Sequence, residues 1–137
     1  MDYILIDTDV CSFLLKGDSR VQVYHPHLLG KVGCLSFQTV AELFQWAELH
    51  NWGVGRRQRF VAWLDHFRLV GSDLETCRAW ARVRAECANA GQPISPQDAW
   101  IAACAIRSNM PLLTHNGDDY ANVSQLQVIT GQARTVN

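Results

Sequence analysis

Near its start the sequence reads Tyr3-Ile4-Leu5-Ile6-Asp7, in which four consecutive apolar residues stop at an acidic one. A short, wholly apolar run of this kind is typical of a strand that is buried on both faces, as in a parallel sheet. Further strands are predicted at Val32–Leu35, Arg68–Val70, Leu112–Thr114 and Leu126–Ile129. The apolar runs therefore predict a central sheet, and the first strand ends directly at a carboxylate.

Helical patterns separate these strands. Asp9 is expected to cap a helix that ends at Lys16-Gly17-Asp18, and Ser36 to cap one that runs to about His50. Three other helices are predicted, at Arg56–Phe67, from a cap at Ser72 or Asp73 to Gly91, and from Ser95-Pro96 to about Asn109. The segment Arg20–Leu29 is predicted to be only weakly helical because Pro26 disturbs it. This alternation predicts an α/β fold with a mostly parallel central sheet and helices on both faces.

Length and composition set the limits of the interpretation. The 137 residues fit a single domain, 1–137, and a hydrophobic fraction of 48% excludes a disordered chain. The formal net charge of −1 means that no overall positive field attracts nucleic acid. Five cysteines without a C-x-x-C pair indicate reduced thiols. With no signal peptide and no apolar run long enough to span a membrane, we expect a soluble cytoplasmic protein.

Several carboxylates are expected near the carboxyl ends of the strands, where α/β sheets bind ligands. Asp7 ends the first strand, Glu42 follows the second, and the turn His115–Asp119 follows a later one. Hydrolysis of a phosphodiester needs an activated water and stabilised phosphoryl charge, which two divalent ions about 4 Å apart can supply. Carboxylates suit this role because Mg²⁺ and Mn²⁺ prefer oxygen ligands.

Each acid also has a purely structural interpretation. Asp7 could be a turn residue, and Glu42 a solvated helix residue. Asp98 stands three residues after Ser95, where a carboxylate favours the helix start, and Asp118 and Asp119 are ordinary turn residues. Taken singly, none of these residues establishes an enzyme.

Four segments together resemble the PIN-domain family, and closely its bacterial VapC-type toxins. They are ILIDTD at 4–9, SFQTVAEL at 36–43, GQPISPQDAWIA at 91–102 and LTHNGDDY at 113–120. These segments follow the family's order across essentially the whole chain. The resemblance implies a PIN-like three-layer domain.

The resemblance also implies a site. Its catalytic and metal-binding residues would be Asp7, Glu42, Asp98 and Asp119, holding Mg²⁺ or Mn²⁺. Three further residues would support these ligands without binding the metal. Thr8 and Thr114 would place a hydroxyl near the metal or the phosphate, and Asn116 would orient a ligand or a water molecule. The chain departs from the family at three positions: Asp9 where Asn is usual, Tyr120 where Phe is commoner, and Asp118 beside Asp119, which leaves the fourth acid ambiguous.

The activity that the resemblance implies is that of an endoribonuclease toxin of a toxin–antitoxin pair. It would hydrolyse RNA with a metal-activated water, form a homodimer and bind a small antitoxin protein. Two alternatives stay open: a non-catalytic PIN-like module that binds nucleic acid or protein, and a DNA-cutting nuclease, against which the short chain argues. Two further sets of residues also have two interpretations. One is a set of arginines that could bind RNA phosphates or form solvated helix faces, at positions 56, 57, 59, 78, 82 and 84. The other is the five Trp, which could stack on bases or pack inside the protein, and of these Trp46 is best placed near Glu42.

Overall fold

Five parallel strands form the centre of the computed structural model, which describes residues 2–131. The sheet has the order β3-β2-β1-β4-β5. The strands are β1 Asp2–Ile6, β2 Lys31–Ser36, β3 Arg68–Val70, β4 Leu112–Leu113 and β5 Val128–Ile129. The predicted α/β class is confirmed, and all four pairings in the described chain are parallel.

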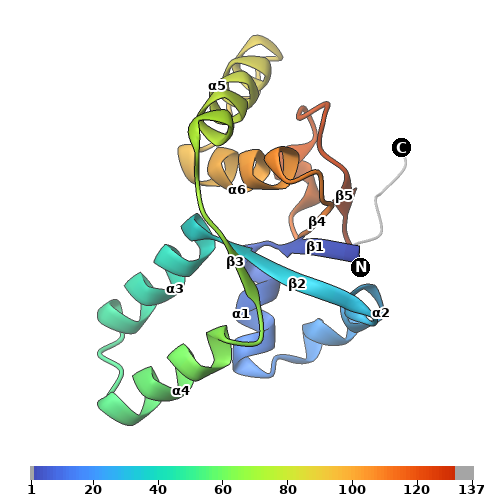
Figure 1. The fold of residues 1–137 in the computed structure, drawn as a ribbon. Coiled ribbons are helices and arrows are strands. Elements are labelled where there is room, and N and C mark those ends of the chain that lie inside the picture. The colour runs from blue at the N-terminus through green and yellow to red at the C-terminus, as the bar shows by residue number, and fades with distance from the viewer. Residues whose placement is uncertain (1, 132–137) are drawn as a thin grey trace.

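Helices cover both faces of this sheet, as Figure 1 shows. α5 and α6 lie on one face, and α1, α3 and α4 lie on the other. The helical segments are α1 Thr8–Lys16, η1 Ser19–Val23, α2 His25–Leu28, α3 Phe37–Leu49, α4 Val54–Leu64, α5 Leu74–Asn89, α6 Pro96–Arg107 and η2 Gly117–Tyr120. The result is three layers with the sheet in the middle.

The side chains of β1 alternate between two hydrophobic cores. Ile4 and Ile6 point into the core beneath α1, α3 and α4, whereas Leu5 packs into the core beneath α5 and α6. All three side chains are at most 1% exposed. Burial on both faces is the physical reason why the strand is an unbroken apolar run.

The register of the parallel strands places their carboxyl ends at one edge. Leu5 pairs with Leu112 and with Cys34, and Ile6 pairs with Leu113. The residues that follow β1 and β4, Asp7 and Thr114, are therefore neighbours, and the amide of Asp7 donates to the carbonyl of Leu113 at 2.8 Å. This edge positions the candidate site.

Most helix boundaries agree with the predicted signals. Ser36, Asp73 and Ser95 cap α3, α5 and α6 through hydrogen bonds to the backbone of the first turn. Gly17 ends α1 at φ 66°, a left-handed conformation that costs glycine little.

Two expectations about helix starts are wrong. Asp7, and not Asp9, is the N-cap of α1, because the chain leaves β1 and turns into the helix without an intervening loop. α4 begins at Val54 and ends at Leu64, earlier than predicted at both ends, and Asp65–Phe67 continue it only as turns. Pro26 occupies the first turn of α2, where its missing N–H costs no hydrogen bond.

Within residues 2–131, none of the helices combines the length and the apolar character that crossing a bilayer requires.

Candidate active site

Asp7 is the most enclosed carboxylate at the edge where the strands end. Its side chain is held by three donors: the Thr8 amide to Oδ1 at 2.7 Å, the Thr114 hydroxyl to Oδ2 at 2.7 Å, and the Tyr120 hydroxyl to Oδ2 at 2.9 Å. The residue is only 6% exposed. Burial, and then the negative charge of Asp9, raise the pKa of Asp7 to about 7.

Asp98 reaches the same edge from the first turn of α6. The Ser95 hydroxyl accepts the amide hydrogen of Asp98 at 3.1 Å, which fixes the start of the helix. The Tyr120 hydroxyl lies 3.4 Å from Oδ1 of Asp98, so one phenol links Asp98 to Asp7. Burial raises the pKa of the Asp98 carboxyl, and the charges of Asp119 and Glu42 raise it further.

Asp119 and Glu42 are the two carboxylates whose charges act on Asp98. Asp119 is exposed on η2 and lines a pocket of about 380 Å³ together with Asp98 and Asp118. Glu42 is half-buried on α3 and accepts a 3.1 Å hydrogen bond from the side-chain Nε2 of Gln38 one turn earlier. Both carboxylates are close enough to Asp98 to act on its ionisation.

Asp9 plays a different part from the other acids. Its Oδ2 accepts hydrogen bonds from the His115 amide at 3.0 Å and from Asn116 Nδ2 at 3.1 Å, and the Thr114 hydroxyl, which donates mainly to Asp7, lies 3.4 Å away. Its Oδ1 accepts from the Val10 amide at 2.6 Å. Asp9 therefore ties the segment after β4 to the start of α1.

No Lys or Arg within residues 2–131 forms an ion pair with this acidic group, and the basic side chain that acts on it is His115, whose charge lowers the pKa of Asp9. The ion pairs that join residues 2–131 use other carboxylates, namely Asp2, Asp18, Glu48, Asp73 and Glu75. Like charges at a partly buried edge raise the electrostatic energy of the fold, and a bound cation would lower it. The chemistry of the donor set therefore fits a hard divalent cation.

The carboxylates of this edge are not close enough together to surround one ion. In the part of the chain that the structure describes, no three Asp, Glu, His or Cys side chains converge closely enough to hold one ion. Asp7 and Asp98 are fixed by their hydrogen bonds, whereas Asp119 is exposed and can change rotamer. A cation would have to draw Asp119 and Glu42 toward the Asp7–Asp98 pair.

The three supporting residues that the resemblance implied lie at this edge. The Thr114 hydroxyl contacts Asp7 directly, and Asn116 contacts Asp9. The Thr8 hydroxyl instead lies 3.0 Å from the hydroxyl of Thr39 on α3. Two features of the site were missed from the sequence: the hydrogen bonds of the Tyr120 hydroxyl and those that Asp9 accepts from the loop after β4. The only signal for either was that both residues depart from the family pattern.

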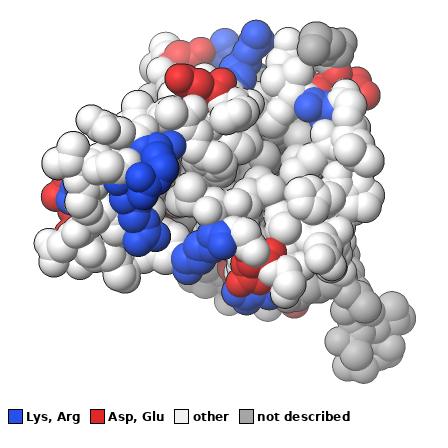
Figure 2. Space-filling model, turned by 90° about the horizontal axis from the view of Figure 1, so that it is seen from below, with Lys and Arg blue, Asp and Glu red and all other residues white. Residues whose placement is uncertain are grey.

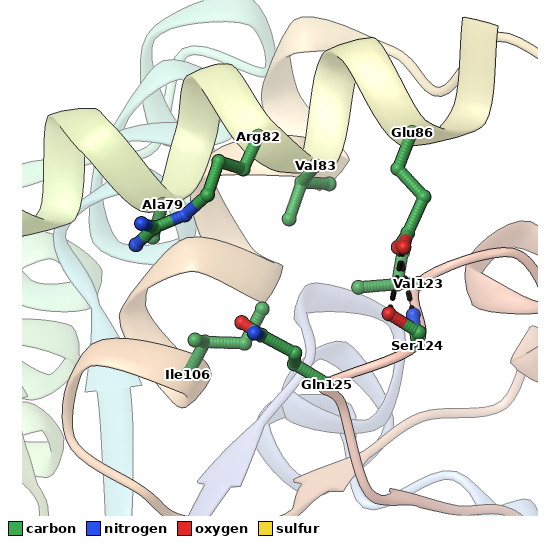
Figure 3. A pocket seen from close by; sticks show the side chains of 8 residues that line it. All are labelled: Ala79, Arg82, Val83, Glu86, Ile106, Val123, Ser124 and Gln125. Carbon is green, nitrogen blue, oxygen red and sulfur yellow. Dashed lines mark hydrogen bonds between the residues drawn. The ribbon is translucent and has the colours of Figure 1, made fainter. Parts of the chain in front are cut away.

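A second pocket lies between α5, α6 and the segment before β5, and it is small, about 90 Å³. In Figure 3, Glu86 of α5 reaches Ser124, whose amide and hydroxyl donate to the carboxylate at 2.8 and 2.6 Å. These bonds lower the pKa of Glu86. The one carboxylate among the residues that line this pocket is thus already hydrogen-bonded to Ser124. We therefore interpret the pocket as part of the packing between α5 and the segment before β5, and not as a binding site.

Several arginines proposed for RNA have structural partners. Arg57 pairs with Glu48 at 2.6 Å, Arg78 with Glu75 at 3.4 Å, and Arg84 donates to the carbonyl of Ile94 at 2.6 Å. Figure 2, viewed from the side of α1 and α4, shows basic side chains in separate groups with acidic ones nearby, and not as a continuous basic patch. Electrostatic attraction of RNA over this face would therefore be local.

The tryptophans mostly pack against other aromatic or cationic side chains. Trp80 and Trp100 stack with ring centroids 5.0 Å apart, and Trp52 is 8% exposed. Trp46 packs against Trp52 and beneath Lys16, whose Nζ lies 4.0 Å from the ring centroid. The packing interpretation is confirmed for these four, and Trp46 is not among the residues that line the 380 Å³ pocket.

Comparison with known proteins identifies the family. The model of the PIN domain matches residues 4–126. The tRNA(fMet)-specific endonuclease VapC of Shigella flexneri is 25% identical over 124 residues, which are 90% of this chain and 93% of that protein.

Solved structures share the fold. The structure of VapBC2 from Rickettsia felis bound to a promoter DNA fragment has a TM-score of 0.81 at 18% identity, covering 93% of this chain and 98% of that one. A toxin–antitoxin complex from Klebsiella pneumoniae has a TM-score of 0.76 at 21% identity, covering 94% and 98%. Because the family model spans most of the chain, including all four acids of the edge, this protein belongs to the PIN-domain family.

Proposed function

We propose that this protein is a divalent-metal-dependent endoribonuclease and the toxin of a toxin–antitoxin pair. The observation that carries the proposal is the group of carboxylates around Asp7 and Asp98, which is partly buried and forms no ion pair with a Lys or Arg within residues 2–131. Such an arrangement is costly to a fold unless a cation uses it. The similarity to an endonuclease over 90% of the chain supports the same activity.

In this proposal Asp7, Asp98, Asp119 and Glu42 would hold Mg²⁺ or Mn²⁺. When bound, the metal supplies positive charge opposite the phosphate oxygens and makes a water molecule more acidic. Asp7 and Asp98, which both contact the Tyr120 hydroxyl, would bind the ion from the protein interior, and Asp119 and Glu42 would complete the site. Thr114 orients Asp7, and Asp9 holds the Thr114–Asn116 segment in place.

A protein partner is the second part of the proposal. Relatives of this fold are found in complexes with antitoxins, and we infer a small antitoxin for this chain as well. Exposed apolar side chains at the end of α3 and along α4 support a protein contact: Leu49, Val54 and Val61 are 70%, 73% and 50% exposed. Burying such side chains stabilises a complex, and a homodimer would use the same chemistry.

The test is cleavage by the purified protein. We expect it to cut RNA in Mn²⁺ or Mg²⁺ and to stop in EDTA, and initiator tRNA is the first substrate to try because the Shigella relative is specific for it. A single-stranded DNA of the same sequence is the control for the DNA-cutting alternative. RNA that binds without being cut, at any metal concentration, would support the non-catalytic module instead.

A further inference from the structure

Tyr120 occupies the space between the two fixed carboxylates. Its hydroxyl lies 2.9 Å from Oδ2 of Asp7 and 3.4 Å from Oδ1 of Asp98, and the residue is 2% exposed. A phenol has one proton, so it donates mainly to the nearer oxygen, that of Asp7, while remaining within reach of Asp98. The hydroxyl therefore spans the gap between β1 and α6 from the protein side.

The hydrogen bonds around Asp7 separate an inner from an outer oxygen. Oδ2 accepts from both Tyr120 and Thr114, two buried side chains, and this uses both of its lone pairs. Oδ1 accepts only from the Thr8 amide among the described residues, and it keeps one lone pair. Oδ1 is thus the oxygen that can bind a ligand from outside.

The ring and the hydroxyl of Tyr120 have separable roles. The ring belongs to the core beneath α5 and α6, with Leu5, Leu112 and Val123 among its members. A phenylalanine would fill that space equally well. Only the hydroxyl reaches the carboxylates, so its contribution can be removed without removing the packing.

We propose that Tyr120 is a positioning residue for the metal site, whose hydroxyl holds Asp7 and Asp98 at a fixed separation and turns the free lone pair of Asp7 toward the ion. This inference rests on the proposed metal-dependent function. Groups that orient metal ligands in this way typically change metal affinity about 10- to 100-fold when they are removed.

The experiment compares Tyr120→Phe with Tyr24→Phe by titrating Mn²⁺ into each protein in a calorimeter. Tyr24 is a matched control because it is 1% exposed and its hydroxyl meets His115 Nδ1 at 2.5 Å, not a carboxylate. We expect Tyr120→Phe to bind Mn²⁺ about 10-fold more weakly than the parent and Tyr24→Phe to stay within about twofold. RNA cleavage by Tyr120→Phe should need correspondingly more Mn²⁺ and recover when the metal is saturating.

An unchanged Mn²⁺ affinity for Tyr120→Phe would overturn the inference, because the residue would then serve packing alone. A tighter affinity would also overturn it, since the hydroxyl would then compete with the ion. The calorimetric readout needs no RNA: a parent that binds Mn²⁺ but never cuts RNA refutes the proposed function and leaves this inference to be decided by the variant. A parent that binds no Mn²⁺ refutes both.

Discussion

The hydroxyl of Thr114 donates a 2.7 Å hydrogen bond to Oδ2 of Asp7 and so joins the carboxyl ends of β4 and β1. Both side chains are buried, and Thr114 is not exposed at all. The same hydroxyl oxygen accepts the amide hydrogen of Asn116 at 3.2 Å. One side chain thus supports the carboxylate and the loop that leads to Asp119.

Replacing Thr114 by valine should destabilise the protein although the shape is nearly kept. Valine leaves the Asn116 amide and Asp7 Oδ2 each without one partner, and a buried group that loses its partner costs about 1–3 kcal/mol. The measurement is the free energy of unfolding in urea. Thr114→Ser retains the hydroxyl and should lose less; equal losses for the two variants would mean that the methyl group, and not the hydrogen bond, is responsible.

Asp9 is predicted to order the segment after β4. Asp9→Ala removes the acceptor of the His115 amide, so the exchange of that amide hydrogen should accelerate about 10-fold, the equivalent of roughly one hydrogen bond. Hydrogen exchange by NMR measures this directly. Asp118→Ala, which removes an exposed acid from the same loop, should leave the His115 amide unchanged. Equal exchange rates in Asp9→Ala and the parent would show that Asp9 does not hold this loop.

The contact of Asp73 with Arg107 predicts a pH dependence that is independent of the metal site. Arg107 donates to both oxygens of Asp73, at 2.9 to 3.2 Å, and with the Thr76 contacts it holds the pKa of Asp73 below its ordinary value of 3.8. A carboxyl with a lowered pKa stabilises the fold above its unfolded pKa, and this is lost as the pH falls toward the folded one.

Arg107→Gln should therefore lower the melting temperature at pH 7, and the difference from the parent should shrink below about pH 4. Melting curves between pH 3 and pH 7 measure it. A difference that stays constant over this range would mean that Arg107 contributes through packing and not through its charge.

The start of α6 allows the cap and the metal ligand to be separated. Asp98→Asn keeps the backbone amide that Ser95 caps but removes a charge, so RNA cleavage should fall by at least about 100-fold in a folded protein. Ser95→Ala removes the cap and one hydrogen bond to the Asp98 carboxyl and costs about 1 kcal/mol of stability, but it keeps the charge of Asp98, so cleavage should stay within a few-fold. If Asp98→Asn instead loses stability but keeps its cleavage rate, Asp98 supports the start of the helix and is not a metal ligand.

The strands and most helix caps could be predicted because each rests on a local signal. Buried parallel strands are continuous apolar runs, and Ser36, Asp73 and Ser95 cap helices through bonds to residues three positions away. The identity of the first N-cap could not be predicted in this way. Asp7 and Asp9 are equally good capping residues, and only the abrupt turn out of β1 selects Asp7.

The hydrogen bonds that Tyr120 and Asp9 make inside the site could not be predicted from the sequence either. The Tyr120 hydroxyl meets a residue 113 positions away, and Asp9 meets loop residues more than 100 positions away. Such contacts depend on the strand order β2-β1-β4, which no local pattern encodes. The motif order indicated which acids share an edge, whereas their hydrogen bonds required the fold.

The central claim, that these carboxylates form one divalent-metal site, makes a prediction about melting temperature. Burial and the charges of Asp119 and Glu42 raise the pKa of Asp98, so ionisation of this carboxyl costs the metal-free fold stability, and the cost grows as the pH rises. In EDTA at pH 8, Asp98→Asn should melt above the parent. Metal binds only the folded protein, so Mn²⁺ should raise the melting temperature of the parent and hardly that of Asp98→Asn.

The most direct measurement is therefore one melting series at pH 8, with the parent, Asp98→Asn and Asp65→Asn in EDTA and in increasing Mn²⁺. Asp65 is an exposed acid at the end of α4, outside the site, and serves as the control for loss of one charge. The account predicts that the parent and Asp65→Asn gain stability with Mn²⁺ while Asp98→Asn starts higher in EDTA and stays nearly constant. If Asp98→Asn instead starts lower than the parent and shows the same Mn²⁺ shift, Asp98 binds no metal and the account is contradicted.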